Sequence, residues 1–245
     1  MKRHIPNFIT LLNLFSGCIA TVFAVLNQLE FAAVFMFLGI FFDFFDGFAA
    51  RLLKVKSDLG VQLDSLADMV TSGLVPGIVM FQLLTMAQKG GWNLDLFGTH
   101  TEVGVLPLFG FIITLASAYR LANFNVDENQ VSSFLGLPTP ANALLILSLP
   151  MILIYHHNDV LNEMILNPWF LMVLTVTSAF LLNSRIELFA LKFETYSFRE
   201  NAIKYLFLIG SLVLLLTLRF LAIPLIILLY IVASLINKLS SRRDG

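Results

Sequence analysis

Four aspartates within 26 residues are the feature of the sequence best suited to chemistry: Asp43, Asp46, Asp64 and Asp68. Residues three or four apart lie on one face of a helix, so the first two share a face, and the last two share a face of a second helix. Small residues beside them let a ligand or another helix approach the backbone closely, namely Gly47, Ala50 and Gly60. The spacing therefore predicts that two helices bring four carboxylates together.

The charge of these carboxylates needs compensation, because the flanking sequence is apolar. A carboxylate at membrane depth costs a few kcal/mol, and Arg51, the nearest cation on that face, offsets about one of the four charges. Carboxylate oxygens suit Mg²⁺ or Mn²⁺, and two such ions would nearly neutralise the cluster. Paired metal ions typically bind phosphate oxygens and neutralise a leaving group, so the cluster favours phosphoryl-transfer chemistry.

Two other interpretations of the four aspartates stay open. The carboxylates could lie at helix ends in solvated ion pairs. They could also form the cation or proton pathway of a transporter. A pathway would distribute carboxylates across the membrane depth, whereas these four lie near one end of the predicted helices.

The composition indicates which elements must position the cluster. Of 245 residues, 58% are hydrophobic and 13% are charged, about half the charged share of a soluble domain. The chain has no basic stripe with interleaved aromatics, which argues against nucleic-acid binding. A single cysteine, Cys18, excludes an intrachain disulfide.

We predict an all-α, polytopic membrane helix bundle that forms a single domain over residues 1–245. A spanning helix needs about 20 apolar residues, and eight segments come close to this: 8–26, 31–53, 65–87, 104–122, 139–156, 167–186, 203–218 and 220–238. Six spans are the fallback. We expect the first segment to be a retained helix rather than a cleaved signal, because polar residues interrupt it.

The distribution of Lys and Arg predicts the orientation. With the N-terminus inside, only Lys89 and Arg219 fall on the outer side. The other thirteen of the fifteen fall inside: Lys2, Arg3, Arg51, Lys54, Lys56, Arg120, Arg185, Lys192, Arg199, Lys204, Lys238, Arg242 and Arg243. We therefore expect an integral protein of the cytoplasmic membrane, with both termini, the 52–63 loop and the aspartates on the cytoplasmic side.

The segment from Asp43 to Asp68 reads D-x2-D-G-x2-A-R-x8-G-x3-D-x3-D, and it resembles the signature of the CDP-alcohol phosphotransferases at every fixed position. Within that family the chain is most similar to bacterial and archaeal phosphatidylserine synthases. Supporting segments are 6–10 with Asn13, 120–125 and 136–141. The resemblance covers about the first 200 residues.

The resemblance implies two metal ions, Mg²⁺ or Mn²⁺. Asp43, Asp46 and Asp64 correspond to ligands of the first ion, and Asp43, Asp64 and Asp68 to ligands of the second. Asp68 also corresponds to the base that activates the acceptor hydroxyl. Contacts to the CDP-lipid are implied for three further residues: Gly47, which allows close approach, Arg51, which pairs with phosphate, and Ser57, which offers a hydroxyl to the nucleotide.

The acceptor side rests on fewer residues. Arg120, with Asn123 three residues later, could hold the serine carboxylate or a phosphate; the alternative is a cytoplasmic arginine that caps a helix C-terminus. Asn7 and Thr10 could contact the nucleotide or merely cap the first helix.

Together these features lead us to expect a metal-dependent transfer of the phosphatidyl group from CDP-diacylglycerol to L-serine, which gives phosphatidylserine and CMP. The same chemistry with glycerol 3-phosphate or an inositol phosphate is the alternative within the family, and a cation-coupled transporter is the alternative outside it. A phosphorylated acceptor needs more basic residues than Arg120, Lys54 and Lys56 supply. The resemblance also implies a homodimer in the lipid membrane.

Overall fold

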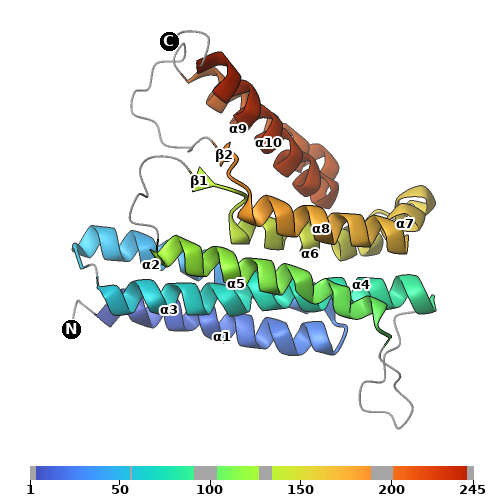
Figure 1. Ribbon diagram of the computed structural model, residues 1–245, viewed down its shortest axis with the longest axis horizontal. Helices are drawn as coiled ribbons and strands as arrows, with labels where there is room; N and C mark the ends of the chain where they lie inside the picture. Colours follow the sequence, from blue (N-terminus) through green and yellow to red (C-terminus); the bar gives the residue numbers. More distant parts are fainter. Residues whose placement is uncertain (1–3, 56, 91–103, 127–133, 189–200, 242–245) are drawn as a thin grey trace.

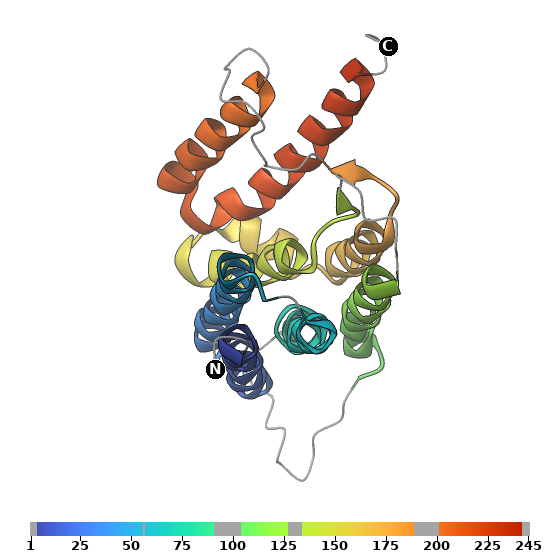
Figure 2. The ribbon, with the colours of Figure 1, turned by 90° about the vertical axis from the view of Figure 1, so that its left-hand side faces the viewer.

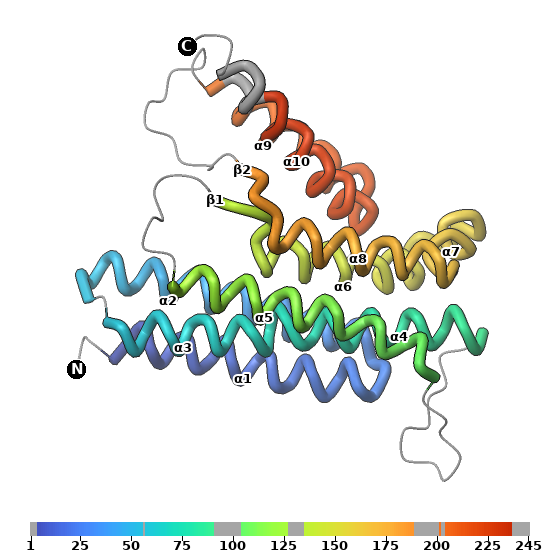
Figure 3. Tube along the Cα trace, in the orientation of Figure 1, coloured from blue at the N-terminus to red at the C-terminus, as the bar shows by residue number. Residues whose placement is uncertain are grey.

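A computed structural model of the protein describes residues 4–55, 57–90, 104–126, 134–188 and 201–241. The described part is almost wholly helical, with a short β-ribbon (Figure 1, Figure 3). In chain order the elements are α1 (Ile5–Val25), α2 (Leu29–Leu53), α3 (Asp58–Asp68), the π-helix η2 (Met69–Leu74), α4 (Val75–Lys89), the 3₁₀ helix η3 (Leu106–Gly110), α5 (Phe111–Val126), β1 (Phe134–Leu135), α6 (Thr139–Tyr155), α7 (Asp159–Ile165), α8 (Pro168–Asn183), β2 (Glu187–Leu188), α9 (Ala202–Leu218), the 3₁₀ turn η4 (Arg219–Leu221) and α10 (Ala222–Ser241).

The predicted all-α membrane bundle is confirmed, since each of the eight expected segments contains a helix. By length and composition, five helical stretches of the described chain can cross a membrane. The pair α7 and α8, bent by 62°, makes a sixth if it counts as one span, and α6 is apolar but shorter. The number of full-length spans is therefore nearer to the fallback of six than to eight.

The turn between α2 and α3 reverses the chain, so the two aspartate-bearing helices run in opposite directions (Figure 1). Lys54 ends α2 in the left-handed conformation, with a φ of 53°. Ser57 then begins α3 as its N-cap, because its hydroxyl accepts a hydrogen bond of 3.1 Å from the Gly60 N–H. Both helices pack against α1, so their aspartates lie at the same end of the bundle.

The stretch Asp58–Lys89 is the central helix of the bundle and is mostly buried. It packs against α1, α5 and α6, which surround it in the end-on view of Figure 2. A π-helical turn interrupts it, and the Val75 N–H bonds to Val70 O, five residues back. Pro76 follows at the first turn of α4. Because proline lacks an N–H and its ring clashes with the carbonyl four residues earlier, the wider turn accommodates it.

The last two helices form a hairpin. Arg219 reverses the chain with a φ of 50°, and the ring centroids of Phe207 and Tyr230, on α9 and α10, lie 5.5 Å apart.

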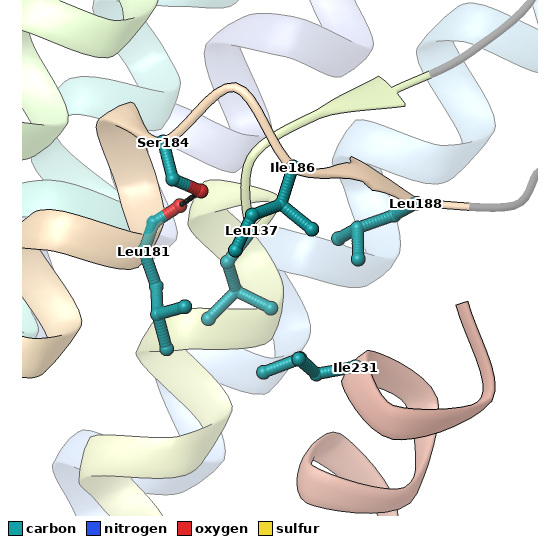
Figure 4. Close-up of a pocket in the computed structure, with 6 residues that line it drawn as sticks. All are labelled: Leu137, Leu181, Ser184, Ile186, Leu188 and Ile231. Carbon is teal, nitrogen blue, oxygen red and sulfur yellow. Dashed lines mark hydrogen bonds between the residues drawn. The ribbon is translucent and has the colours of Figure 1, made fainter. Parts of the chain in front are cut away.

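A small apolar hollow lies where the β-ribbon meets α10 (Figure 4). Its lining residues are Leu137, Leu181, Ser184, Ile186, Leu188 and Ile231. The Ser184 hydroxyl is already used, because it donates a hydrogen bond of 3.0 Å to Leu181 O.

Arg51, Lys54 and Arg120 lie toward one end of the bundle. The end of α2, the start of α3 and the end of α5 lie toward this end (Figure 1). Arg51 is in the last turn of α2, whereas Lys89 ends α4 at the opposite end. Lys56, Lys192, Arg199 and the terminal basic residues, like most of the expected outer loop at 88–103, lie outside the described residues.

Candidate active site

The predicted convergence of carboxylates is seen at the end of the bundle where α2 meets α3. One carboxylate oxygen from each of Asp43, Asp46 and Asp64 lies within 4.8 Å of the other two. Asp46 is 6% exposed, and the other two are half-buried. The side chains of Asp43 and Asp64 face each other from the two helices and interact directly. As their spacing predicts, helices α2 and α3 bring these three carboxylates together.

Asp68 lies one turn further along α3, next to this group rather than within it. Its side chain is 9% exposed. Asp43, Asp46 and Asp64 are all close enough to repel it electrostatically, and Arg120 is close enough to attract it. The fourth carboxylate thus adjoins the tight group and faces the one described arginine on α5.

Helix α1 supports the cluster through two buried polar side chains one turn apart. The Thr10 hydroxyl donates a hydrogen bond of 2.5 Å to Asp46 Oδ2, and Asn13 Nδ2 donates one of 3.2 Å to Asp68 Oδ1. Thr10 therefore contacts a carboxylate and does not cap α1, whose N-cap is His4. The part played by Asn13 escaped the sequence reasoning. Asn13 supported the resemblance but was given no role there, although it and Thr10 are polar residues three apart on one face of an apolar helix.

The donor set fits a divalent cation. Asp64 Oδ1 is buried and has no hydrogen-bond partner among the described residues. A buried carboxylate oxygen without a partner is costly, and three converging carboxylates are costly together unless a cation neutralises them. Oxygen ligands of this kind suit Mg²⁺ and Mn²⁺. Asp43, Asp46 and Asp64 can therefore hold a metal ion, with Asp68 near enough to extend the site.

Gly47 and Arg51 flank the carboxylates on α2. A Cβ built on Gly47 would meet no atom within 4 Å, so there is open space beside this part of the helix. Arg51 lies one turn further on and is exposed. The structure thus leaves room for a ligand next to the carboxylates, with a cation at its edge.

Asn7 and Ser57 meet at the start of α3. A Cβ on Gly60 would lie 3.1 Å from Ser57 Oγ and 3.2 Å from Asn7 Oδ1, so all three residues are close together. The Ser57 hydroxyl has a structural task here as the N-cap of α3. Asn7 lies in the first turns of α1 without capping it.

Arg120 does not cap the C-terminus of its helix, which was the alternative interpretation of this residue. The helix α5 continues to Val126, beyond the predicted end at 122, so Arg120 lies within it rather than in its last turn. The Arg120 Nε atom is buried and has no hydrogen-bond partner in the described part of the chain. Asn123, one turn on, is exposed. Arg120 is thus close enough to Asp68 to attract it, whereas the Asn123 side chain is exposed.

Asn125 connects α5 to α3 through hydrogen bonds that the sequence did not predict. Ser65 Oγ donates a hydrogen bond of 3.1 Å to Asn125 Oδ1, and Asn125 Nδ2 donates one of 3.2 Å to Gln62 Oε1. Ser65 is the neighbour of Asp64 in the sequence. These bonds fix the end of α5, and with it Arg120, relative to the aspartates of α3.

Comparison with known proteins agrees with this site. Residues 3–182 match the family model described as CDP-alcohol phosphatidyltransferase. The chain is 32% identical over 142 residues to the CDP-diacylglycerol–serine O-phosphatidyltransferase of Bacillus subtilis, a match that covers 56% of this chain and 70% of the relative.

Two other relatives carry the same name. The protein from Methanocaldococcus jannaschii is 31% identical over 142 residues, which is 58% of each chain. The one from Saccharomyces cerevisiae is 33% identical over 162 residues, 60% of this chain and 53% of the relative. The match thus spans little more than half the length of these two relatives. Because the family model covers well over half of the present chain and includes all four aspartates, the chain belongs to the CDP-alcohol phosphatidyltransferase family.

Proposed function

We propose that the protein transfers the phosphatidyl group of CDP-diacylglycerol to the hydroxyl of L-serine, with divalent metal, and releases CMP. The observation that carries the proposal is the group of Asp43, Asp46 and Asp64 within 4.8 Å, adjoined by Asp68 at a polar end of an apolar bundle. The family match supports phosphatidyl transfer, and the names of the relatives support serine as the acceptor.

The carboxylates would divide into two ligand sets. Asp43, Asp46 and Asp64 would hold one ion, and Asp43, Asp64 and Asp68 the other. When bound, Mg²⁺ or Mn²⁺ neutralises the carboxylates and the diphosphate and stabilises charge on the leaving CMP. The hydrogen bond from Thr10 to Asp46 keeps one member of the first set in place.

The donor lipid would lie against α2. The open space beside Gly47 lets the diphosphate approach the backbone, and Arg51 at its edge pairs with a phosphate oxygen. Asn7 stands beside the start of α3 and offers its amide to the nucleotide. Ser57 contributes mainly by capping α3, since its hydroxyl is already engaged.

The acceptor would approach between α3 and α5. The serine hydroxyl gives its proton to Asp68 and its oxygen forms a bond to the β-phosphorus, while the bond from that phosphorus to the oxygen of CMP breaks. Arg120, attracted to Asp68 and with its Nε unpaired, is the cation available for the serine carboxylate. No covalent intermediate on the protein is required.

Two observations argue against a transporter. The aspartates lie in the last three turns of α2 and the first three of α3, within about 15 Å of the helix ends. A pathway needs polar groups across the whole span. Beyond them, the central helix continues as the largely apolar α4.

The acceptor is tested with purified protein in detergent, labelled CDP-diacylglycerol and a panel of alcohols: serine, glycerol 3-phosphate and inositol phosphate. Water alone serves as the sample without an alcohol. We expect CMP release with serine and an equal amount of labelled phosphatidylserine. Release with a phosphorylated alcohol but not with serine would keep the chemistry and replace the acceptor. No CMP release with any alcohol would contradict the proposed function itself.

A further inference from the structure

Thr71, in the π-helical turn that follows Asp68, is enclosed by two other helices. It is wholly buried. A Cβ added to Gly39 of α2 would lie 2.6 Å from Thr71 Cγ2 and 2.9 Å from Asn13 Oδ1. A Cβ on Gly17 of α1 would overlap the Thr71 hydroxyl. Three helices therefore close around this one side chain, and a residue larger than glycine would displace it.

The Thr71 hydroxyl fixes the orientation of the Asn13 amide. It lies 2.8 Å from Asn13 Oδ1 and 3.3 Å from the Asn13 carbonyl oxygen, so its shorter hydrogen bond goes to the side chain, and Asn13 Nδ2 in turn donates one of 3.2 Å to Asp68 Oδ1. A carboxamide has its acceptor on one side and its donors on the other. Holding the oxygen on Thr71 thus directs the nitrogen to Asp68, and a rotated amide would instead present its oxygen to the carboxylate.

Asp68 needs such a partner, because competing forces act on it. The carboxylates of Asp64 and Asp46 repel it, and the guanidinium of Arg120 attracts it. The Asn13 amide is its one described hydrogen-bond donor. Without that donor the carboxylate is free to turn toward Arg120, away from the group of three aspartates.

We propose that Thr71 and Asn13 are positioning residues for the phosphatidyl transfer: Thr71 sets the amide of Asn13, and Asn13 holds the carboxylate of Asp68 in the direction from which it receives the acceptor proton. The chain of contacts runs from Thr71 in the π-turn, through Asn13 on α1, to Asp68 at the end of α3. This inference rests on the proposed function, and it assigns a task to a part of the central helix that touches no substrate.

The test separates the effect of the Thr71 hydroxyl from the effect of side-chain packing at this position. Thr71→Val keeps the shape and removes the donor, whereas Thr71→Ser keeps the donor and removes the methyl group. Thr85→Val is the matched control, because Thr85 is also buried on the central helix but donates only to Phe81 O of its own helix. For each full-length variant, kcat with serine is measured, along with binding of CDP-diacylglycerol in the absence of acceptor.

We expect Thr71→Val to lower kcat about 10–100-fold, as loss of a supporting hydrogen bond around a ligating group typically does, with CDP-diacylglycerol binding within about threefold of the original. Thr71→Ser should restore kcat to within about threefold, since its hydroxyl can make the same bond. A Thr71→Val protein with unchanged kcat would overturn the inference. So would an equal loss in Thr71→Ser, or a loss of binding as large as the loss of kcat, because either would indicate packing alone.

If Thr71→Val does not give a monodisperse protein, Asn13→Asp supplies the same test. It keeps the oxygen that accepts from Thr71 and replaces the donor that faces Asp68. We expect the same fall in kcat with donor-lipid binding retained, and an unchanged kcat would overturn the inference. A protein that lacks turnover before any substitution contradicts the proposed function instead, so the two failures are distinct.

Discussion

At the scale of single residues, Asp43 and Asp68 have different neighbours and should therefore differ in what their loss does. Asp43 is in direct contact with Asp64 inside the group of three carboxylates. Asp68 stands next to that group, held by Asn13 and close to Arg120. Asp43 thus belongs to the part that would hold metal and diphosphate, and Asp68 to the part that faces the acceptor.

Asp68→Asn keeps the size of the side chain but cannot accept a proton at neutral pH. We expect turnover to fall by roughly 10²–10⁴, while binding of CDP-diacylglycerol stays within a few-fold. Asp43→Asn should weaken both, because in the proposed mechanism the diphosphate is bound through the metal that Asp43 holds. CMP release and lipid binding are measured on variants matched for monodispersity. Near-normal turnover in Asp68→Asn would remove Asp68 from the role of base.

The residues that contact the aspartates were harder to predict than the aspartates. Helical spacing alone placed Asp43 beside Asp46 and Asp64 beside Asp68. The contacts of Thr10 and Asn13 depend on how α1 crosses α2 and α3, and a crossing angle cannot be read from one helix. The same holds for Asn125, whose partners lie about 60 residues earlier in the sequence.

At the scale of elements, the start of α3 determines where Asp64 and Asp68 point. Ser57 is its N-cap, and the Gly60 N–H is bonded to the Ser57 hydroxyl. The first turn of a helix has N–H groups without helical partners, so the cap stabilises this end. Fraying there would loosen the two carboxylates that follow.

Ser57→Ala should lower stability by about 0.5–2 kcal/mol, because it removes the cap. Ser57→Asn should recover most of that loss, since asparagine caps as well as serine does. Thermal unfolding in detergent and the KM for CDP-diacylglycerol are measured for both. A Ser57→Asn protein with restored stability but a tenfold higher KM would show that the hydroxyl contacts the nucleotide, contrary to our assignment of the cap as its main task.

The sequence predicted the long apolar helices, but it did not predict the short helix α7 or the irregularities of the others. Apolar length located all eight expected segments, because lipid-facing helices are apolar over their whole span. The π-turn at Met69–Leu74 could not be predicted, since it follows from Pro76 together with the packing of Thr71. The extra turn of α5 beyond residue 122 is polar, with Asn123 and Asn125, so an apolar criterion ended the helix too early.

At the scale of the whole molecule, the proposed transfer to serine requires that the aspartates face the side of the membrane where serine and CDP are found. The described basic residues near the aspartates, such as Arg51 and Lys54, lie at the opposite end of the bundle from Lys89. A bias of this kind orients a membrane protein with the basic end inside.

We therefore expect Lys56→Cys to be labelled from the cytoplasmic side only and Lys89→Cys from the outer side only. Cys18 is the single cysteine, so a Cys18→Ser background is free of other thiols. Inside-out vesicles and intact cells are labelled with a reagent that does not cross membranes. Labelling of Lys89→Cys in the vesicles and of Lys56→Cys in cells would mean that the orientation is inverted.

The central claim is that the carboxylate cluster works through divalent metal, and the most direct measurement is CMP release from CDP-diacylglycerol and serine before and after chelation. The three converging carboxylates and the unpaired Asp64 Oδ1 predict that excess EDTA abolishes turnover and that added Mg²⁺ or Mn²⁺ restores it. A dialysed sample without chelator controls for loss of protein. Full turnover in excess EDTA would contradict the account.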